Sequence, residues 1–196
     1  MTAAAPAARA RLLDLLTALS FERRAVVLSS GAPSSFYLDC KQTALHPEGA
    51  YLIGELLHEL VGQIELATGH SAVGVGGLTL GADPLATATS LASRSRSKPL
   101  AAFIVRKEAK GHGTGAWVEG RRNLPDGSPV VLLEDVVTTG GATLKALERV
   151  RQEGLVALGV AALVDRQAGG VERLEDEGLC VRALFRATDF PGIEAA

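Results

Sequence analysis

The sequence predicts an α/β protein whose central, mostly parallel sheet is flanked by helices. From residue 71 onward, strand candidates alternate with helix candidates, and the runs at 130–133 and 160–164 are almost continuously apolar. Such runs suit strands covered on both faces, and helical connections between strands favour parallel pairing. A loop rich in threonine and glycine follows the run at 130–133. In sheets of this kind, ligands bind beyond the carboxyl ends of the strands.

Length and composition indicate one globular domain over residues 1–196. The chain is 47% hydrophobic, 21% charged and 4% aromatic, with a net charge of -2. The apolar content excludes a disordered chain, and the scarcity of aromatic residues argues against a base-stacking nucleic-acid platform. Because no apolar run reaches the roughly 18 residues of a membrane span and no signal-peptide pattern is found, we expect a cytoplasmic protein. Cys40 and Cys180 fit buried apolar positions better than a zinc site or a disulfide.

The N-terminal elements follow from local patterns. Five leucines between residues 12 and 19 recur at helical spacing and predict a helix. Residues 25–29 and 36–39 are expected to be extended, with a turn at 31–33. A second helix is expected to begin at Pro47 and to end near Ala67, since proline is favoured in a first helical turn.

The remainder of the chain alternates. We expect strands at 71–75, 100–105, 130–133, 155–164 and 181–185, and helices at 84–93, 142–152 and 171–177.

Charge is distributed unevenly. Residues 94–122 contain eight basic and two acidic residues, a net charge of +6, so the rest of the chain is acidic. Such a run can be a solvated face, or a site for an anion. No helix-turn-helix or basic helix accompanies it, which argues against a nucleic-acid partner.

The richest chemistry lies at residues 130–143, where a buried strand leads into Glu134, Asp135 and then Thr138-Thr139-Gly140-Gly141. Glycines permit close backbone approach, and the free N–H groups at the start of the next helix can hold a phosphate. Hydroxyls of Thr138, Thr139 and Thr143 can add donors. The two carboxylates suit sugar hydroxyls or water-bound Mg²⁺. The alternative is a capped helix without a ligand.

This stretch resembles the 5-phosphoribosyl 1-pyrophosphate (PRPP) motif of the type I phosphoribosyltransferases. The resemblance implies that family's fold, with a small N-terminal hood supplied, together with the first helix, by residues 1–45. It also implies that Glu134 and Asp135 bind the ribose hydroxyls and that Thr138 to Thr143 hold the 5′-phosphate. Mg²⁺ would be bound through PRPP, near the two carboxylates, without direct protein ligands. The PRPP-binding residues implied by the motif are Glu134, Asp135, Val136, Val137, Thr138, Thr139, Gly140, Gly141 and Ala142.

The basic segment narrows the resemblance. Arg106-Lys107-Glu108-Ala109-Lys110-Gly111-His112-Gly113 is similar to the flexible loop of the orotate phosphoribosyltransferases. A glycine-bounded loop can close over a polyanion and exclude water. The resemblance implies that Arg106, Lys107, Lys110 and His112 contact PRPP. It also implies a homodimer in which loop 106–115 reaches the neighbouring active site.

Other matches concern the base. Residues 35–39 resemble the hood segment, which implies that Tyr37 stacks on orotate, although an ordinary core aromatic is the alternative. Arg166 aligns with an arginine that binds the orotate carboxylate, and a guanidinium suits a planar anion. An ion pair with Asp165 is the alternative there. Thr138 is also expected to contact orotate.

Two positions depart from the family pattern. Residues 76–84 resemble the pyrophosphate-binding loop, but Gly81 stands where several members have lysine, and Ser29 replaces another lysine in the hood. The departures concern two phosphate contacts and leave the implied reaction unchanged.

The resemblance implies transfer of a phosphoribosyl group from PRPP to orotate, with Lys110, His112 and Asp135 as catalytic residues and Mg²⁺ as cofactor. The alternatives are a phosphoribosyltransferase for another base and a non-catalytic regulator that senses PRPP.

Overall fold

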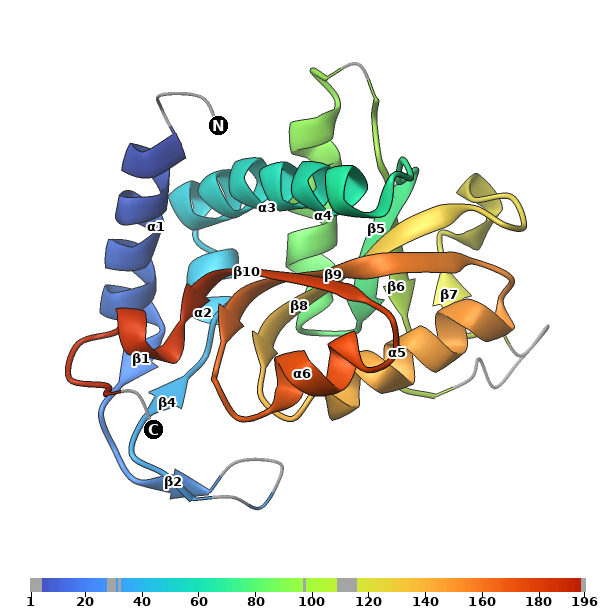
Figure 1. Cartoon of the computed structure of the whole chain (residues 1–196). Coiled ribbons are helices and arrows are strands. Elements are labelled where there is room, and N and C mark those ends of the chain that lie inside the picture. The colour runs from blue at the N-terminus through green and yellow to red at the C-terminus, as the bar shows by residue number, and fades with distance from the viewer. Residues whose placement is uncertain (1–4, 28–30, 32, 97, 109–115, 195–196) are drawn as a thin grey trace.

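The computed structural model describes residues 5–27, 31, 33–96, 98–108 and 116–194. A six-stranded sheet with the order β10-β9-β8-β5-β6-β7 forms its centre (Figure 1). All its pairings are parallel except that of β7 with β6, so the predicted mostly parallel sheet is confirmed. Its strands are β5 (Gly74–Leu78), β6 (Ala101–Val105), β7 (Val118–Glu119), β8 (Pro129–Val137), β9 (Val156–Asp165) and β10 (Cys180–Arg186).

Helices cover both faces of the sheet. The long α3 (Pro47–Thr68) and α4 (Ala82–Ser93) lie on one face, and α5 (Gly141–Gln152) and α6 (Gly170–Glu175) lie on the other (Figure 1). Successive side chains of a strand point to opposite faces. Accordingly, Val131 and Leu133 join the core beneath α3 and α4, while Val130 and Leu132 join the core beneath α5. Because helices cover both faces of the sheet, β8 is apolar at consecutive positions.

The N-terminal segment packs against the end of the sheet where β9 terminates (Figure 1). It consists of α1 (Ala5–Leu19), the paired strands β1 (Phe21–Glu22) and β4 (Tyr37–Leu38), the paired strands β2 (Val26–Val27) and β3 (Pro33–Ser34), and α2 (Lys41–Ala44). We refer to β1–β4 as the hood. The Phe21 ring lies 5.8 Å from that of Phe36 and 5.3 Å from that of Phe190. Phe190 follows the short 3₁₀ turn Ala187–Asp189, so aromatic packing joins the hood to the C-terminal part of the chain.

Most predicted elements are present, with shifted ends. The first helix, the helix from Pro47 and the alternating elements after it are confirmed. The strand expected at 71–75 is instead β5, three residues later, because glycine is depleted in strands and gives no apolar pattern that would mark one. A Cβ at Gly77 would meet the Leu133 carbonyl and lie 2.8 Å from the Ala82 Cβ, so close packing requires glycine there. The short β1, β3, β7, α2 and the 3₁₀ turn Arg121–Asn123 carry no periodic signal and were not predicted.

The cysteines differ in environment. Cys40 is buried, and burial raises the pKa of its thiol well above the usual value. Cys180 is only partly buried, so the prediction of a buried position is confirmed for Cys40 alone. Within the described ranges, no helix is both long and apolar enough to cross a membrane.

Candidate active site

A cavity of about 660 Å³ opens where β8 ends and α5 begins. Its wall combines the turn 138–141, the Glu134 side chain and the basic residues Arg106 and Lys107 after β6. This is the edge at which parallel sheets bind ligands. The lining residues are Leu78, Arg106, Lys107, Glu134, Val136, Val137, Thr138, Thr139, Gly140, Gly141, Ala142, Thr143, Lys145, Glu148 and Arg149.

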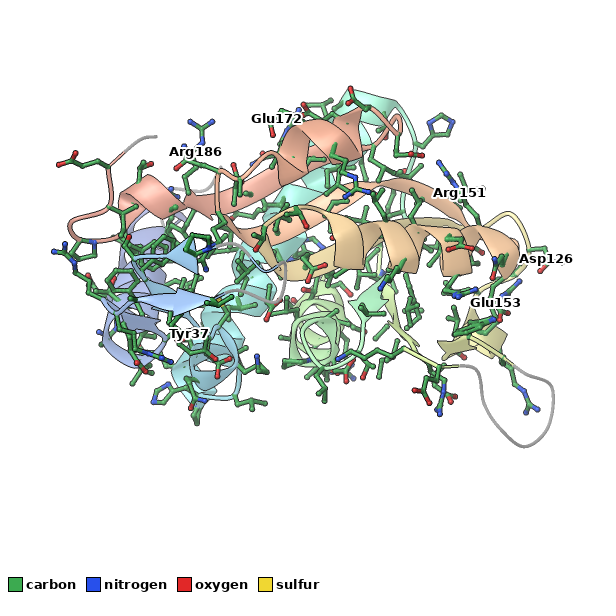
Figure 2. The ribbon with its side chains drawn as sticks, turned by 90° about the horizontal axis from the view of Figure 1, so that it is seen from below. Tyr37, Asp126, Arg151, Glu153, Glu172 and Arg186 are labelled. Atoms are coloured by element: carbon green, nitrogen blue, oxygen red, sulfur yellow. The ribbon has the colours of Figure 1, made fainter. Side chains whose placement is uncertain are left out.

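The turn into α5 has the form of a phosphate cradle. Gly140 has a φ of 74°, in the left-handed region that favours glycine, and α5 begins at the next residue. The first N–H groups of α5 therefore face the cavity without helical acceptors. In the view from below, the other end of α5 is marked by Arg151 in its last turn and by Glu153, the residue that follows the helix (Figure 2).

Helix α6 supports the cradle from behind. Gly170 lies so close to the turn that a Cβ there would meet the Thr138 carbonyl and lie 2.8 Å from the Gly140 nitrogen. Arg173, one turn further along, donates a 3.3 Å hydrogen bond from Nη1 to the Thr139 carbonyl. The cradle is thus shaped by α6 as well as by its own glycines.

Glu134 is a buried carboxyl group in the wall of the cavity. Its Oε2 accepts a 2.7 Å hydrogen bond from Thr143 Oγ1, so this threonine hydroxyl is directed to Glu134. Burial, followed by the adjacent Asp135 charge, raises the pKa of Glu134 to about 8. The site therefore contains a carboxyl group that is ready to accept or release a proton near neutral pH.

The Asp135 side chain lies close enough to Glu134 to contribute to its raised pKa. Its Oδ1 accepts the N–H of Val136 at 2.9 Å, and it lies against the turn before α4. A Cβ at Gly81 would lie 2.8 Å from that oxygen. The backbone at position 81 thus packs directly against Asp135, and a side chain there would require the Asp135 carboxylate to shift.

Two of the four basic residues predicted to bind PRPP line the cavity. Arg106 donates from Nη1 to Glu119 Oε1 at 3.0 Å, and its N–H bonds to the Trp117 carbonyl at 2.9 Å. Lys107 is exposed beside it. Lys110 and His112 lie outside the described residues, and so does Ser29, the hood position that differs from the family pattern.

Sequence reasoning missed Lys145 and Arg149, which line the same cavity from α5. The Arg149 guanidinium lies 3.6 Å from the centre of the Trp117 ring, a cation–π contact that orients it. The two residues are four apart and share one face of the helix. The spacing shows that the two residues share a helix face, but it does not show that this face lines a cavity.

Neither Tyr37 nor Arg166 lines this cavity among the described residues, but the backbone N–H of Arg166 donates to the carbonyl of Val137, a lining residue, at 2.9 Å. Tyr37 is half-buried, and the Arg24 guanidinium lies 4.5 Å from its ring centre. Tyr37 marks the hood in the view from below (Figure 2). Arg166, just after β9, donates from Nη2 to Ser34 Oγ at 2.6 Å and to the Phe36 carbonyl at 2.7 Å.

Arg166 is a buried cation at the edge of the site. Its guanidinium lies 4.0 Å from the centre of the Phe36 ring, and burial lowers its pKa. The alternative ion pair with Asp165 is not formed, because Asp165 Oδ1 instead accepts the N–H of Gln167. Among the described residues, no carboxylate forms a salt bridge with Arg166. A buried charge without a counter-charge in its own fold suits an anionic ligand.

Comparison with known proteins gives the family. Residues 46–185 match the phosphoribosyl transferase domain. An orotate phosphoribosyltransferase from Nostoc sp. is 50% identical over 181 residues, which is 92% of this chain and 84% of that protein. One from Sorangium cellulosum is 48% identical over 190 residues, covering 97% and 96% of the two chains. The chain belongs to the orotate phosphoribosyltransferase family.

A solved member of the family supports the same assignment. The orotate phosphoribosyltransferase of Mycobacterium tuberculosis, solved with Fe(III) dicitrate, is 39% identical, with a TM-score of 0.78 over 93% of this chain and 98% of that one. Its complex with 5-phospho-alpha-D-ribosyl 1-diphosphate has a TM-score of 0.72 at 34% identity, over 93% and 91% of the chains. The predicted type I phosphoribosyltransferase fold is thereby confirmed.

Proposed function

We propose that this member of the orotate phosphoribosyltransferase family transfers the 5-phosphoribosyl group of PRPP to orotate, giving orotidine 5′-monophosphate and pyrophosphate. The product is the precursor of UMP in pyrimidine synthesis. The observation that carries the choice of orotate is Arg166, a buried guanidinium that forms no salt bridge within the described part of the chain. Orotate brings a carboxylate that would supply a counter-charge, whereas purine bases do not.

PRPP would bind along the end of β8. The cradle of Thr138, Thr139, Gly140, Gly141 and Ala142 would hold the 5′-phosphate with backbone N–H groups, supported by the partial positive charge of the α5 N-terminus. Glu134 and Asp135 would accept hydrogen bonds from the ribose hydroxyls, with Val136 and Val137 completing the wall. Arg106 and Lys107 extend the positive lining of the same cavity toward the pyrophosphate.

The base would lie between this cavity and the hood. Tyr37 would stack on the pyrimidine ring, Thr138 would contact the base, and Arg166 would bind its carboxylate. In the present structure Arg24 lies over the Tyr37 ring. Stacking on that face therefore requires Arg24 to move aside, whereas stacking on the opposite face leaves it in place.

Mg²⁺ would enter this site bound to PRPP. Within the described part of the chain, no three His, Cys, Asp or Glu side chains gather to hold a metal ion. A hard cation that retains several waters can be held by pyrophosphate and ribose oxygens near Glu134 and Asp135. When bound, Mg²⁺ would offset the negative charge of the pyrophosphate.

The reaction requires alignment and charge stabilisation more than a protein nucleophile. The pyrimidine nitrogen gives up its proton and forms a bond to C1′ of the ribose while the bond from C1′ to the pyrophosphate oxygen breaks, through an oxocarbenium-like centre. The pyrophosphate leaves with the electron pair of that bond, and the proton passes to it or to water. Asp135 would hold the ribose beside that centre. Lys110 and His112 would stabilise the departing pyrophosphate, His112 with a proton available near neutral pH. These roles rest on the resemblance of loop 106–115 to the family's loop.

We further propose a homodimer in the cytoplasm, in which loop 106–115 of one subunit completes the active site of the other. The support is the match of the basic segment to the family's loop. Arg106 and Lys107, at the start of that loop, already lie at the cavity.

The direct test is to mix the purified protein with orotate, PRPP and Mg²⁺ and to follow loss of orotate absorbance together with pyrophosphate release. We expect both at equal rates. Adenine, guanine and uracil at the same concentrations serve as comparisons. Turnover with a purine alone, or with no base, would contradict the proposal.

A further inference from the structure

The Arg166 side chain connects the end of a sheet strand to the hood. Arg166 follows β9, whereas its hydrogen-bond acceptors, Ser34 Oγ and the Phe36 carbonyl, belong to the hood more than a hundred positions away. The centre of the Phe36 ring lies 4.0 Å from the guanidinium carbon. The hood therefore contacts the guanidinium in two ways: by hydrogen bonds to Nη2 and by the Phe36 ring.

The hood uses one nitrogen of the guanidinium. Nη2 has two protons, and Ser34 and Phe36 provide two acceptors for them, at 2.6 and 2.7 Å. Nε and Nη1 make no hydrogen bond within the described residues. Since the Arg166 residue is only 9% exposed, the side chain has little room to turn. Among the described residues, the donors on Nε and Nη1 therefore remain available to a ligand.

The Ser34 hydroxyl is itself held in one orientation. Its Oγ donates to the Phe36 carbonyl at 2.9 Å and accepts the Phe36 N–H at 3.3 Å. A hydroxyl has one proton, so once it is used toward Phe36, a lone pair of Oγ faces Arg166. Serine turns of this type are set by local backbone geometry. The short hood strand thus presents a fixed acceptor to the guanidinium.

We propose that Ser34 is a positioning residue for substrate recognition: by fixing Nη2 of Arg166, it leaves Nε and Nη1 directed at the carboxylate of the pyrimidine. This inference rests on the proposed function and deepens it. Ser34 acts through Arg166 and does not touch the reacting atoms. Its removal frees the guanidinium to adopt other rotamers, and the cost of fixing it then falls on substrate binding.

The test compares Ser34→Ala with Ser35→Ala, its exposed neighbour in the same hood segment. Loss of a hydrogen bond to a charged group corresponds to about a tenfold change in affinity. We expect Ser34→Ala to raise KM for orotate about tenfold, with KM for PRPP changed less than about twofold. Ser34→Thr, which keeps the hydroxyl, should restore the KM for orotate, and Ser35→Ala should resemble wild type.

A double-mutant cycle separates positioning from general damage. If Ser34 acts through Arg166, the Ser34→Ala change should have little further effect on KM for orotate in an Arg166→Lys background. Thermal unfolding of each variant reports whether the fold is retained. An equal rise in both KM values, an equal effect of Ser35→Ala, failure of threonine to rescue, or full additivity in the cycle would overturn the inference. Wild-type protein inactive on orotate would instead overturn the proposed function.

Discussion

At the scale of single residues, Glu134 shows how burial gives chemistry to an ordinary side chain. The residue is 8% exposed and adjacent to Asp135 in sequence, and its carboxyl group accepts a hydrogen bond from Thr143. Burial disfavours the charged form, and the neighbouring carboxylate does so as well. The raised pKa means that the free protein binds a proton near neutral pH, which PRPP and its cation would displace on binding.

We predict that protonation of Glu134 makes the free energy of unfolding depend on pH. The pKa of Glu134 rises from 4.5 to about 8 on folding, so the folded state binds more protons between those values. The stabilising contribution is therefore complete below pH 4.5 and is lost as pH rises through 8. Urea unfolding across this range should show that wild type loses stability relative to Glu134→Gln, which cannot titrate.

The control is Glu172→Gln, a change at an exposed carboxylate on α6 (Figure 2). Its stability should follow the wild-type pH dependence. Parallel curves for wild type and Glu134→Gln would show that Glu134 does not carry the proton.

At the scale of elements, the turn that we propose as the phosphate cradle depends on the helix behind it. Helix α6 has only six residues, yet its first residue, Gly170, packs against the backbone of Thr138 and Gly140. The shape of the cradle is therefore set by two segments, the turn that forms it and the helix that supports it. Since backbone N–H groups would hold the phosphate, small displacements there matter.

We predict that Gly170→Ala weakens PRPP binding. The added methyl group would meet the Thr138 carbonyl and lie 2.8 Å from Val137 Cγ1, so the turn must shift. We expect KM for PRPP to rise about tenfold or more, a cost of at least about 1.4 kcal/mol. The control is Gly62→Ala in α3, where nothing lies within 4 Å of the added group. That change should leave KM unaltered and increase helix stability by about 0.5–1 kcal/mol.

At the scale of the whole molecule, the charge balance separates into two parts. The net charge of -2 combines an acidic body with a basic segment of +6 at residues 94–122. Arg106 and Lys107 bring the beginning of its loop to the cavity. We propose that this segment serves a pyrophosphate in the neighbouring subunit.

Subunit mixing tests that proposal. Lys110→Ala and Asp135→Asn should each be inactive alone, because each would lose one contribution to every site. In a mixed population about half of the dimers are heterodimers, each with one intact site, so we expect about a quarter of wild-type activity. Exchange can be followed with a tagged subunit. Complete exchange without recovery of activity would exclude a shared site.

Much of the fold was predictable because its signals are local. The apolar runs of β8 and β9 and the leucines of α1 depend on residues close in sequence, and so do the turn residues before α5. Short strands such as β7 depend on a partner strand and carry no periodicity of their own. The extent of β8 through Glu134 and Asp135 likewise depends on its pairing with β9.

For the site, the sequence by itself determined which chemical groups are present: a glycine and threonine turn after a buried strand, two adjacent carboxylates and a basic loop. These are consecutive residues, so their spacing is fixed by the chain. Tertiary structure alone decided that Glu134 and Asp135 face different surroundings, that Lys145 and Arg149 line the cavity, and that Ser34 holds Arg166. Those relations join distant segments through packing, and no local pattern encodes them.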